Sequence, residues 1–81
     1  MTEDQIYAAI VEIISQTLDD KGLDVPEITP ATEVLGDELG IDSLDLATLV
    51  SELEKKIGFD PFAKGFIEFK TVGELTKLYV R

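Results

Sequence analysis

The chain has 81 residues, 44% of them hydrophobic, with no cysteine, no histidine and a net charge of −10 at pH 7, so we expect one small domain with a modest core. Without His or Cys it lacks Ser–His and Cys–His nucleophilic pairs and the usual zinc ligands, which argues against an enzyme. The negative charge disfavours nucleic acid and anionic lipid surfaces. The lack of a long apolar run, a basic leader and cysteines favours a cytoplasmic protein without membrane insertion.

The N-terminal segment is predicted to form a helix over about residues 3–19. Thr2 and Gln5 have the spacing of a capping box, which opens helices. Apolar residues then recur at the spacing of one buried stripe: Ile6, Ala9, Ile10, Ile13, Ile14 and Leu18. Lys21 and Gly22 supply a favourable C-terminal charge and a stop signal.

A long connection is predicted over residues 22–41, because Pro26 and Pro30 forbid a continuous helix. Its apolar residues are expected to anchor it on the core: Leu23, Val25, Ile28, Val34, Leu35, Leu39 and Ile41. Gly36 and Gly40 permit backbone angles that other residues avoid. The acidic residues at the start of the connection lack the spacing of an EF-hand, so we expect no calcium site.

Three more helices are predicted in the second half of the chain. One runs from Ser43 to Ile57 with Gly58 as its end, and the residues expected on its inward face are Leu46, Leu49, Val50, Leu53 and Ile57. A short third helix would begin at Pro61 with Asp60 as its N-cap. A last helix spans about 72–80. The predicted fold class is therefore all-α: a single-domain four-helix bundle with three main helices and one short third helix.

The second long helix opens at Gly40-Ile41-Asp42-Ser43-Leu44-Asp45-Leu46. Asp and Ser are common helix N-caps, and an acid in the first turn suits the helix dipole, so Asp-Ser-Leu-Asp by itself indicates no more than a cap. This stretch lies in the acidic part of the chain, since residues 1–54 contain fourteen acids and one base, Lys21. Such a surface accelerates encounters with basic partners, although a plain solvated surface has the same composition.

The longer context resembles a known family. Leu-Gly-Asp-Glu-Leu-Gly-Ile-Asp-Ser-Leu-Asp, then Leu-x-x-Leu-Val-x-x-Leu-Glu and a late Thr-Val-x-x-Leu, are similar to the acyl carrier protein family over nearly the whole chain. In that family the Ser of the Asp-Ser-Leu motif carries 4′-phosphopantetheine, which comes from coenzyme A. The resemblance implies that Ser43 is the attachment residue, and that the arm supplies the thiol which a cysteine-free chain needs to hold an acyl group as a thioester.

The resemblance also implies partners. These are a phosphopantetheinyl transferase and acyl-loading and acyl-accepting enzymes with basic docking patches, acting on a monomeric carrier. The implied recognition residues are Asp42, Leu44, Asp45, Leu46, Glu52 and Glu54. For Leu44, a core position facing the connection is an equal alternative. Positions that are often acidic or apolar in well-known fatty-acid carriers hold Thr48, Ser51, Lys55 and Lys56 here, which favours a dedicated biosynthetic pathway, such as polyketide or lipid-modifying acyl transfer.

Three other functions stay open at this level. A carrier of the peptidyl or aminoacyl type is an alternative, although the Asp-Ser-Leu-Asp form leans to the acyl type. A small acidic helical adaptor with no covalent arm would have the same composition. An enzyme that uses only carboxylates, such as those of Asp42 and Asp45, is disfavoured because so small a chain offers little room for a pocket.

Overall fold

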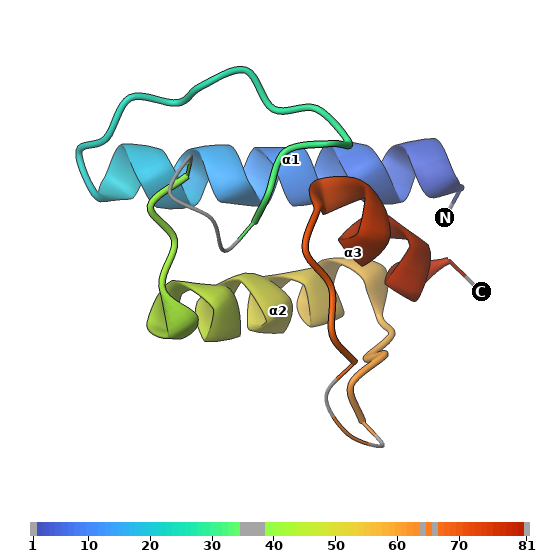
Figure 1. Ribbon diagram of the computed structural model, residues 1–81. Coiled ribbons are helices and arrows are strands. Elements are labelled where there is room, and N and C mark those ends of the chain that lie inside the picture. The colour runs from blue at the N-terminus through green and yellow to red at the C-terminus, as the bar shows by residue number, and fades with distance from the viewer. Residues whose placement is uncertain (1, 35–38, 64, 66, 81) are drawn as a thin grey trace.

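The computed structural model describes residues 2–34, 39–63, 65 and 67–80. Three helices are formed by these residues: α1 (Glu3–Asp20), α2 (Ser43–Ile57) and α3 (Val72–Tyr79). α1 packs against both α2 and α3, and the start of α2 lies beside the end of α1 (Figure 1). The predicted all-α class is confirmed. The long connection joins the end of α1 to the start of α2.

Local signals set the ends of α1 as predicted from the sequence. Both hydrogen bonds of the Thr2–Gln5 capping box form. The helix ends at Asp20, one residue beyond the expected end, and Gly22 follows with a φ of +76°. The Leu23 amide then donates to the Leu18 carbonyl at 2.9 Å, which satisfies one of the carbonyls that a helix end leaves unpaired.

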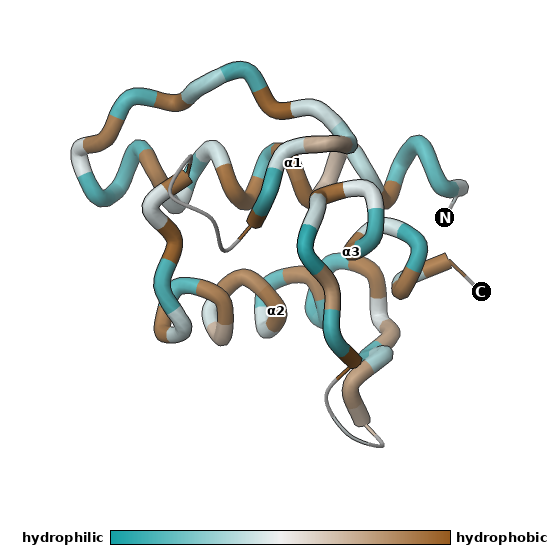
Figure 2. The backbone as a smooth tube through the Cα atoms, viewed as in Figure 1, coloured by the Kyte–Doolittle hydropathy of each residue, from teal (hydrophilic) through white to brown (hydrophobic). Residues whose placement is uncertain are grey.

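The core is built from one face of each helix and from parts of both connections. Its buried members are Ile6, Ala9, Ile10, Ile14, Leu18, Val34, Leu39, Ile41, Leu46, Leu49, Leu53, Phe69, Val72, Leu75 and Tyr79. Figure 2 shows the apolar residues recurring along α1 and α2. Ile13, Val50 and Ile57, which were expected in the inward stripes, are only half-buried, so the core is narrower than the sequence pattern suggested.

The second half of the long connection is fixed to the segment that leads into α3. The amide of Val34 donates to the carbonyl of Lys70 at 2.8 Å, and the amide of Val72 donates to the carbonyl of Thr32 at 2.9 Å. Leu23 and Val25, in the first half, are each 44% exposed. The predicted anchoring is therefore correct for the second half and wrong for these two residues, while Leu35 and Gly36 lie outside the described residues.

The expected short third helix is not formed by the described residues between α2 and α3. Asp60 accepts a hydrogen bond from the Phe62 amide at 2.9 Å, as in an N-cap. The chain then makes single turns, in which Ala63 donates to the carbonyl of Asp60 and Gly65 to that of Phe62. Gly65 has a φ of +135°, an angle that a right-handed helix does not contain. Lys64 and Phe66 lie outside the described residues.

Candidate functional site

Ser43 is the first residue of α2, and Asp42, not Ser43, is the N-cap. Oδ1 of Asp42 accepts a hydrogen bond from the Asp45 amide at 2.9 Å, and Oδ2 of Asp45 accepts one from the Asp42 amide at 3.4 Å. Ser43 is exposed, and its hydroxyl makes no hydrogen bond to any residue that the structure describes. The cap is therefore complete without this hydroxyl, which faces solvent and is available for chemistry.

Lys21 reaches this turn from the end of α1. Its Nζ donates to Oδ2 of Asp45 at 2.5 Å and to the carbonyl of Gly40 at 3.1 Å. The hydrogen bond from Lys21 holds the pKa of the Asp45 carboxyl below its usual value, and the same bond raises the pKa of Lys21. From the sequence Lys21 was assigned only to the end of the first helix, although it is the single base in residues 1–54.

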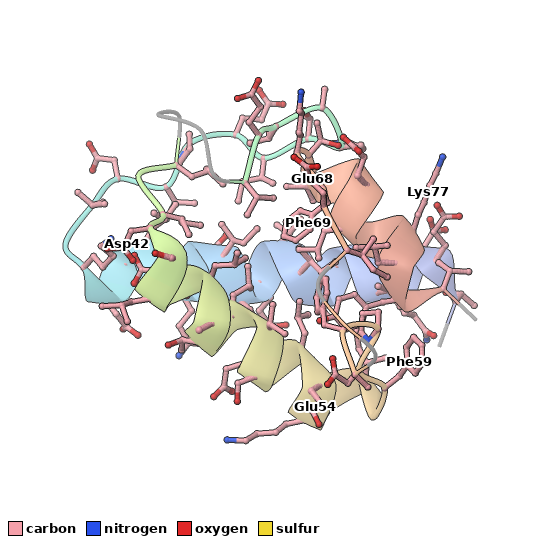
Figure 3. The ribbon with its side chains drawn as sticks, turned by 60° about the horizontal axis from the view of Figure 1, so that its bottom comes forward. Asp42, Glu54, Phe59, Glu68, Phe69 and Lys77 are labelled. Atoms are coloured by element: carbon pink, nitrogen blue, oxygen red, sulfur yellow. The ribbon has the colours of Figure 1, made fainter. Side chains whose placement is uncertain are left out.

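An apolar hollow of about 430 Å³ lies along α2 beside Ser43. Its lining consists of Ser43, Leu46, Ala47, Val50, Ser51, Glu54 and Phe62. The ring of Phe62 stacks obliquely on Phe69 and meets Tyr79 edge-on, with centroids 6.1 and 6.4 Å apart. The hollow follows α2 away from the turn that holds Ser43. Figure 3 shows Asp42 at the start of this helix and Glu54 near its other end.

The residues expected to recognise partners do not form one surface. Leu44 is 80% exposed, so it does not occupy the core position that was its alternative. Leu46 is only 9% exposed and forms part of the wall of the apolar hollow. Asp42 is exposed, whereas Asp45 is half-buried and paired with Lys21. Of these four residues, Leu44 and Asp42 are therefore the best placed to contact a partner.

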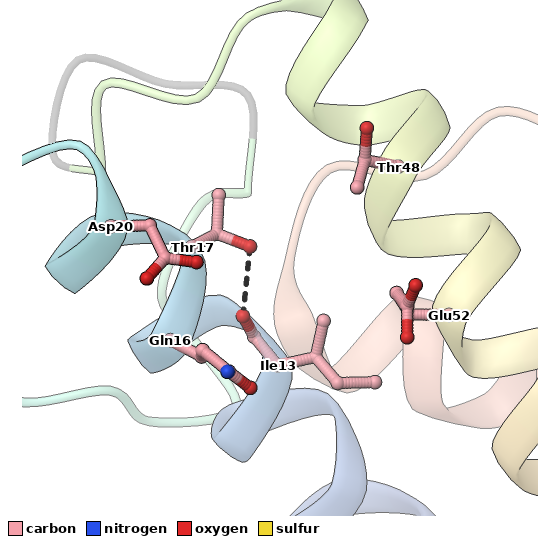
Figure 4. Close-up of a pocket in the computed structure, with 6 residues that line it drawn as sticks. All are labelled: Ile13, Gln16, Thr17, Asp20, Thr48 and Glu52. Carbon is pink, nitrogen blue, oxygen red and sulfur yellow. Dashed lines mark hydrogen bonds between the residues drawn. The ribbon is translucent and has the colours of Figure 1, made fainter.

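Glu52 and Glu54 are separated by the helix on which they lie. Glu54 lines the apolar hollow, and Glu52 lines a second hollow of about 230 Å³ between α1 and α2. The other residues of this second hollow are Ile13, Gln16, Thr17, Asp20 and Thr48 (Figure 4). The resemblance implied that both glutamates are recognition residues. Their positions show that they cannot face the same partner surface.

Two features are absent from the described parts of the chain. Those residues contain no group of three or more His, Cys, Asp or Glu side chains that could hold a metal ion. Of the helices they form, none is both long enough and apolar enough to cross a membrane.

Comparison with known proteins identifies the family. A family model described as "Phosphopantetheine attachment site" matches residues 8–79. The chain belongs to this family of phosphopantetheine-binding carriers. The match covers all of α2 and most of α1, and it includes the turn around Ser43. The prediction of the acyl carrier family, and with it of a covalent 4′-phosphopantetheine as the cofactor, is confirmed at the level of the family.

Three curated proteins, each named "Acyl carrier protein", are similar over nearly the whole chain. The protein of Thermotoga maritima is 31% identical over 91% of this chain and 86% of its own length. That of Saccharopolyspora erythraea is 32% identical over 96% of this chain and 78% of its own length. That of an Exiguobacterium species is 35% identical over 93% of this chain and 90% of its own length. Members of the family with this name are carriers.

The described residues fit a covalently attached arm. An exposed hydroxyl with no partner among the described residues stands on the first turn of a helix, where unpaired backbone N–H groups and the dipole favour an anion such as a phosphodiester. A hollow with a mainly apolar lining begins at the same residue. Among the described residues, no side chain would have to move to expose Ser43 and no hydrogen bond would have to break.

Proposed function

We propose that this chain is an acyl carrier with its 4′-phosphopantetheine arm attached to Oγ of Ser43. The observation that carries the proposal is the position of this hydroxyl, which is exposed at the start of α2 while Asp42 provides the cap. A hydroxyl without an internal hydrogen bond can enter the active site of another enzyme without leaving a partner group unsatisfied. Once bound, the arm supplies a thiol that holds an acyl group as a thioester.

Attachment would take place in a separate phosphopantetheinyl transferase. Oγ of Ser43 forms a bond to the phosphorus of coenzyme A that carries the pantetheine, and the bond from that phosphorus to the adenosine bisphosphate leaving group breaks. The hydroxyl proton passes to a base of the transferase. The helix N-terminus favours the product phosphodiester by roughly 0.3–1 kcal/mol. Because Asp42 and Asp45 repel an anion, we assign them to capping and to partner recognition.

The partners proposed for the loaded carrier are acyl-loading and acyl-accepting enzymes with basic docking patches. Support comes from Leu44, which is 80% exposed directly after Ser43, and from the exposed carboxylate of Asp42. Lys55 and Lys56 lie in the last turn of α2, where they pair with Glu52 and Glu12. Lysines at positions that are often acidic or apolar in well-known fatty-acid carriers support a dedicated pathway. We further propose that the carrier acts as a monomer in the cytoplasm and catalyses no reaction of its own.

The test is an intact-mass measurement after incubation with coenzyme A and a promiscuous phosphopantetheinyl transferase. Wild type is compared with Ser43→Ala and with Ser51→Ala. Ser51 is a matched control because it is also an exposed serine of α2 that lines the same hollow. We expect wild type and Ser51→Ala to gain one phosphopantetheinyl group and Ser43→Ala to gain none.

Measuring the masses of tryptic peptides from wild type cannot replace the comparison of variants in this experiment. The peptide between Lys21 and Lys55 contains both Ser43 and Ser51, so its mass alone does not distinguish the two serines. A folded wild-type protein that gains no mass would contradict the proposal and favour an adaptor without a covalent arm. A Ser43→Ala protein that still accepts the group would place the attachment elsewhere.

A further inference from the structure

We propose that Lys21 is a positioning residue for arm attachment, because it holds the turn on which Ser43 is presented and offsets the acidic charge around it. The inference rests on the proposed role of Ser43. Lys21 is the C-cap residue of α1 and the first residue of the long connection. Through Nζ it contacts Gly40 and Asp45, one before and one after Ser43 in the chain.

The first step of the argument is geometric. The Lys21 ammonium joins three elements: the end of α1, the turn at Gly40, which has a φ of +67°, and the first turn of α2. The capping bonds between Asp42 and Asp45 join residues of the same turn, at the start of α2. They therefore do not fix the position of this turn relative to α1. Among the ion pairs of the described residues, Lys21–Asp45 is the one that ties this helix start to α1.

The second step concerns charge. A phosphoryl group that approaches Ser43 meets the carboxylates of Asp42 and Asp45, which repel it. Lys21 places one positive charge on this turn, within hydrogen-bonding distance of Asp45. The side chains of Lys21 and Asp45 are 33% and 22% exposed, so solvent screens this pair less than it would screen a fully exposed one. Lys21 therefore reduces the local repulsion at the nucleophile.

The structure supplies a matched control. Lys56 Nζ lies 3.0 Å from Oε2 of Glu12 and forms another ion pair between α2 and α1, but it does so at the C-terminal end of α2. Lys21→Gln and Lys56→Gln each remove one positive charge and one pair between the same two helices. Only the first of these substitutions changes the turn that carries Ser43.

The experiment measures kcat and KM of the transferase with the carrier as the varied substrate, at saturating coenzyme A. Relative to wild type, we expect Lys21→Gln to lower kcat about tenfold with a KM change of less than about threefold, as for a misplaced nucleophile. We expect Lys56→Gln to stay within about twofold in both constants. Lys21→Arg, which keeps the charge and can donate to the same two oxygens, should recover most of kcat.

Asp45→Asn breaks the same pair from its other side, and this keeps the test decisive if Lys21→Gln is unfolded at the assay temperature. Because Lys21 is held to act through Asp45, Asp45→Asn should also lower kcat, but less than Lys21→Gln does, since it removes one of the repelling carboxylates along with the tie. The double variant should be no slower than the slower single variant. Circular dichroism at the assay temperature checks that each variant is folded. An unchanged or faster kcat in folded Lys21→Gln or Asp45→Asn would overturn the inference, as would an equal loss in Lys56→Gln.

A failure of the inference about Lys21 can be told apart from a failure of the proposed function. If wild type is loaded at Ser43 and Lys21→Gln is loaded equally fast, Ser43 keeps its role and Lys21 loses the one proposed here. If wild type is not loaded, or if Ser43→Ala is loaded, the proposed attachment itself is wrong, and the role inferred for Lys21 is overturned with it.

Discussion

The carboxylate of Asp42 accepts a hydrogen bond from the amide of Asp45 at 2.9 Å, and Ser43 lies between them in the chain without taking part. The residues of the Asp-Ser-Leu-Asp stretch therefore have different roles. The two aspartates start the helix, and the serine hydroxyl is left free for modification. Stability and attachment are therefore expected to depend on different residues of the same turn.

The first prediction concerns this division. Asp42→Ala should lower the free energy of unfolding by about 1 kcal/mol because it removes the N-cap. Ser43→Ala should change it by less than about 0.5 kcal/mol, because the hydroxyl makes no hydrogen bond to a described residue. Urea denaturation followed by circular dichroism measures both. If Ser43→Ala were as destabilising as Asp42→Ala, the serine hydroxyl would contribute to the cap.

The second prediction contrasts the two tyrosines. The hydroxyl of Tyr7 donates to the carbonyl of Ile28 at 3.2 Å, whereas the buried hydroxyl of Tyr79 has no hydrogen-bond partner among the described residues. Tyr7→Phe should therefore lower the free energy of unfolding by about 1 kcal/mol, and Tyr79→Phe should leave it unchanged or raise it by about 1 kcal/mol. Chemical denaturation at neutral pH measures both. A clear loss of stability in Tyr79→Phe would reveal a partner for that hydroxyl.

The third prediction concerns alkaline pH. Burial raises the pKa of Tyr79 to about 12, and the negative charges of Asp60 and Glu54 add to the effect. Above pH 10 the unfolded chain loses this proton while the folded chain keeps it. The resulting stability is complete below pH 10 and is lost as the pH rises to about 12, by about 2 to 3 kcal/mol.

Tyr79→Phe provides the comparison for this third prediction. Its free energy of unfolding should fall less steeply than that of wild type between about pH 10 and about pH 12, because it lacks the proton that only the folded state retains. Tyr7→Phe, which keeps Tyr79, is the control for removal of a tyrosine hydroxyl. Parallel curves for wild type and Tyr79→Phe would contradict the assignment.

The fourth prediction concerns ionic strength. With a net charge of −10, the folded chain repels itself at low salt. Raising NaCl from about 0.01 M to about 1 M shortens the Debye length from about 30 Å to about 3 Å, so the melting temperature should rise. Differential scanning calorimetry measures the change, and a melting temperature that is independent of salt would contradict it.

Local signals in the sequence were enough to predict most of the fold. The caps at Thr2, Asp42 and Thr71 lie where helices begin, because a cap needs only a side-chain oxygen and an amide three residues later. Gly58 ends α2 with a φ of +79°, as a glycine in that position indicates. The prediction of a short third helix was wrong for the described residues. Its few residues carried a cap signal, but they had no periodic apolar stripe long enough to decide between a helix and successive turns.

The sequence by itself determined the three helices that the described residues form, the family and the candidate serine, because each depends on neighbouring residues or on a contiguous motif. Only the tertiary structure decided which charges act together. It placed Lys21 against Asp45, 24 positions along the chain, and it set Glu52 beside α1 and Glu54 beside Phe62. The reason is that such contacts depend on how α2 packs along α1, and no local pattern in the sequence records that packing.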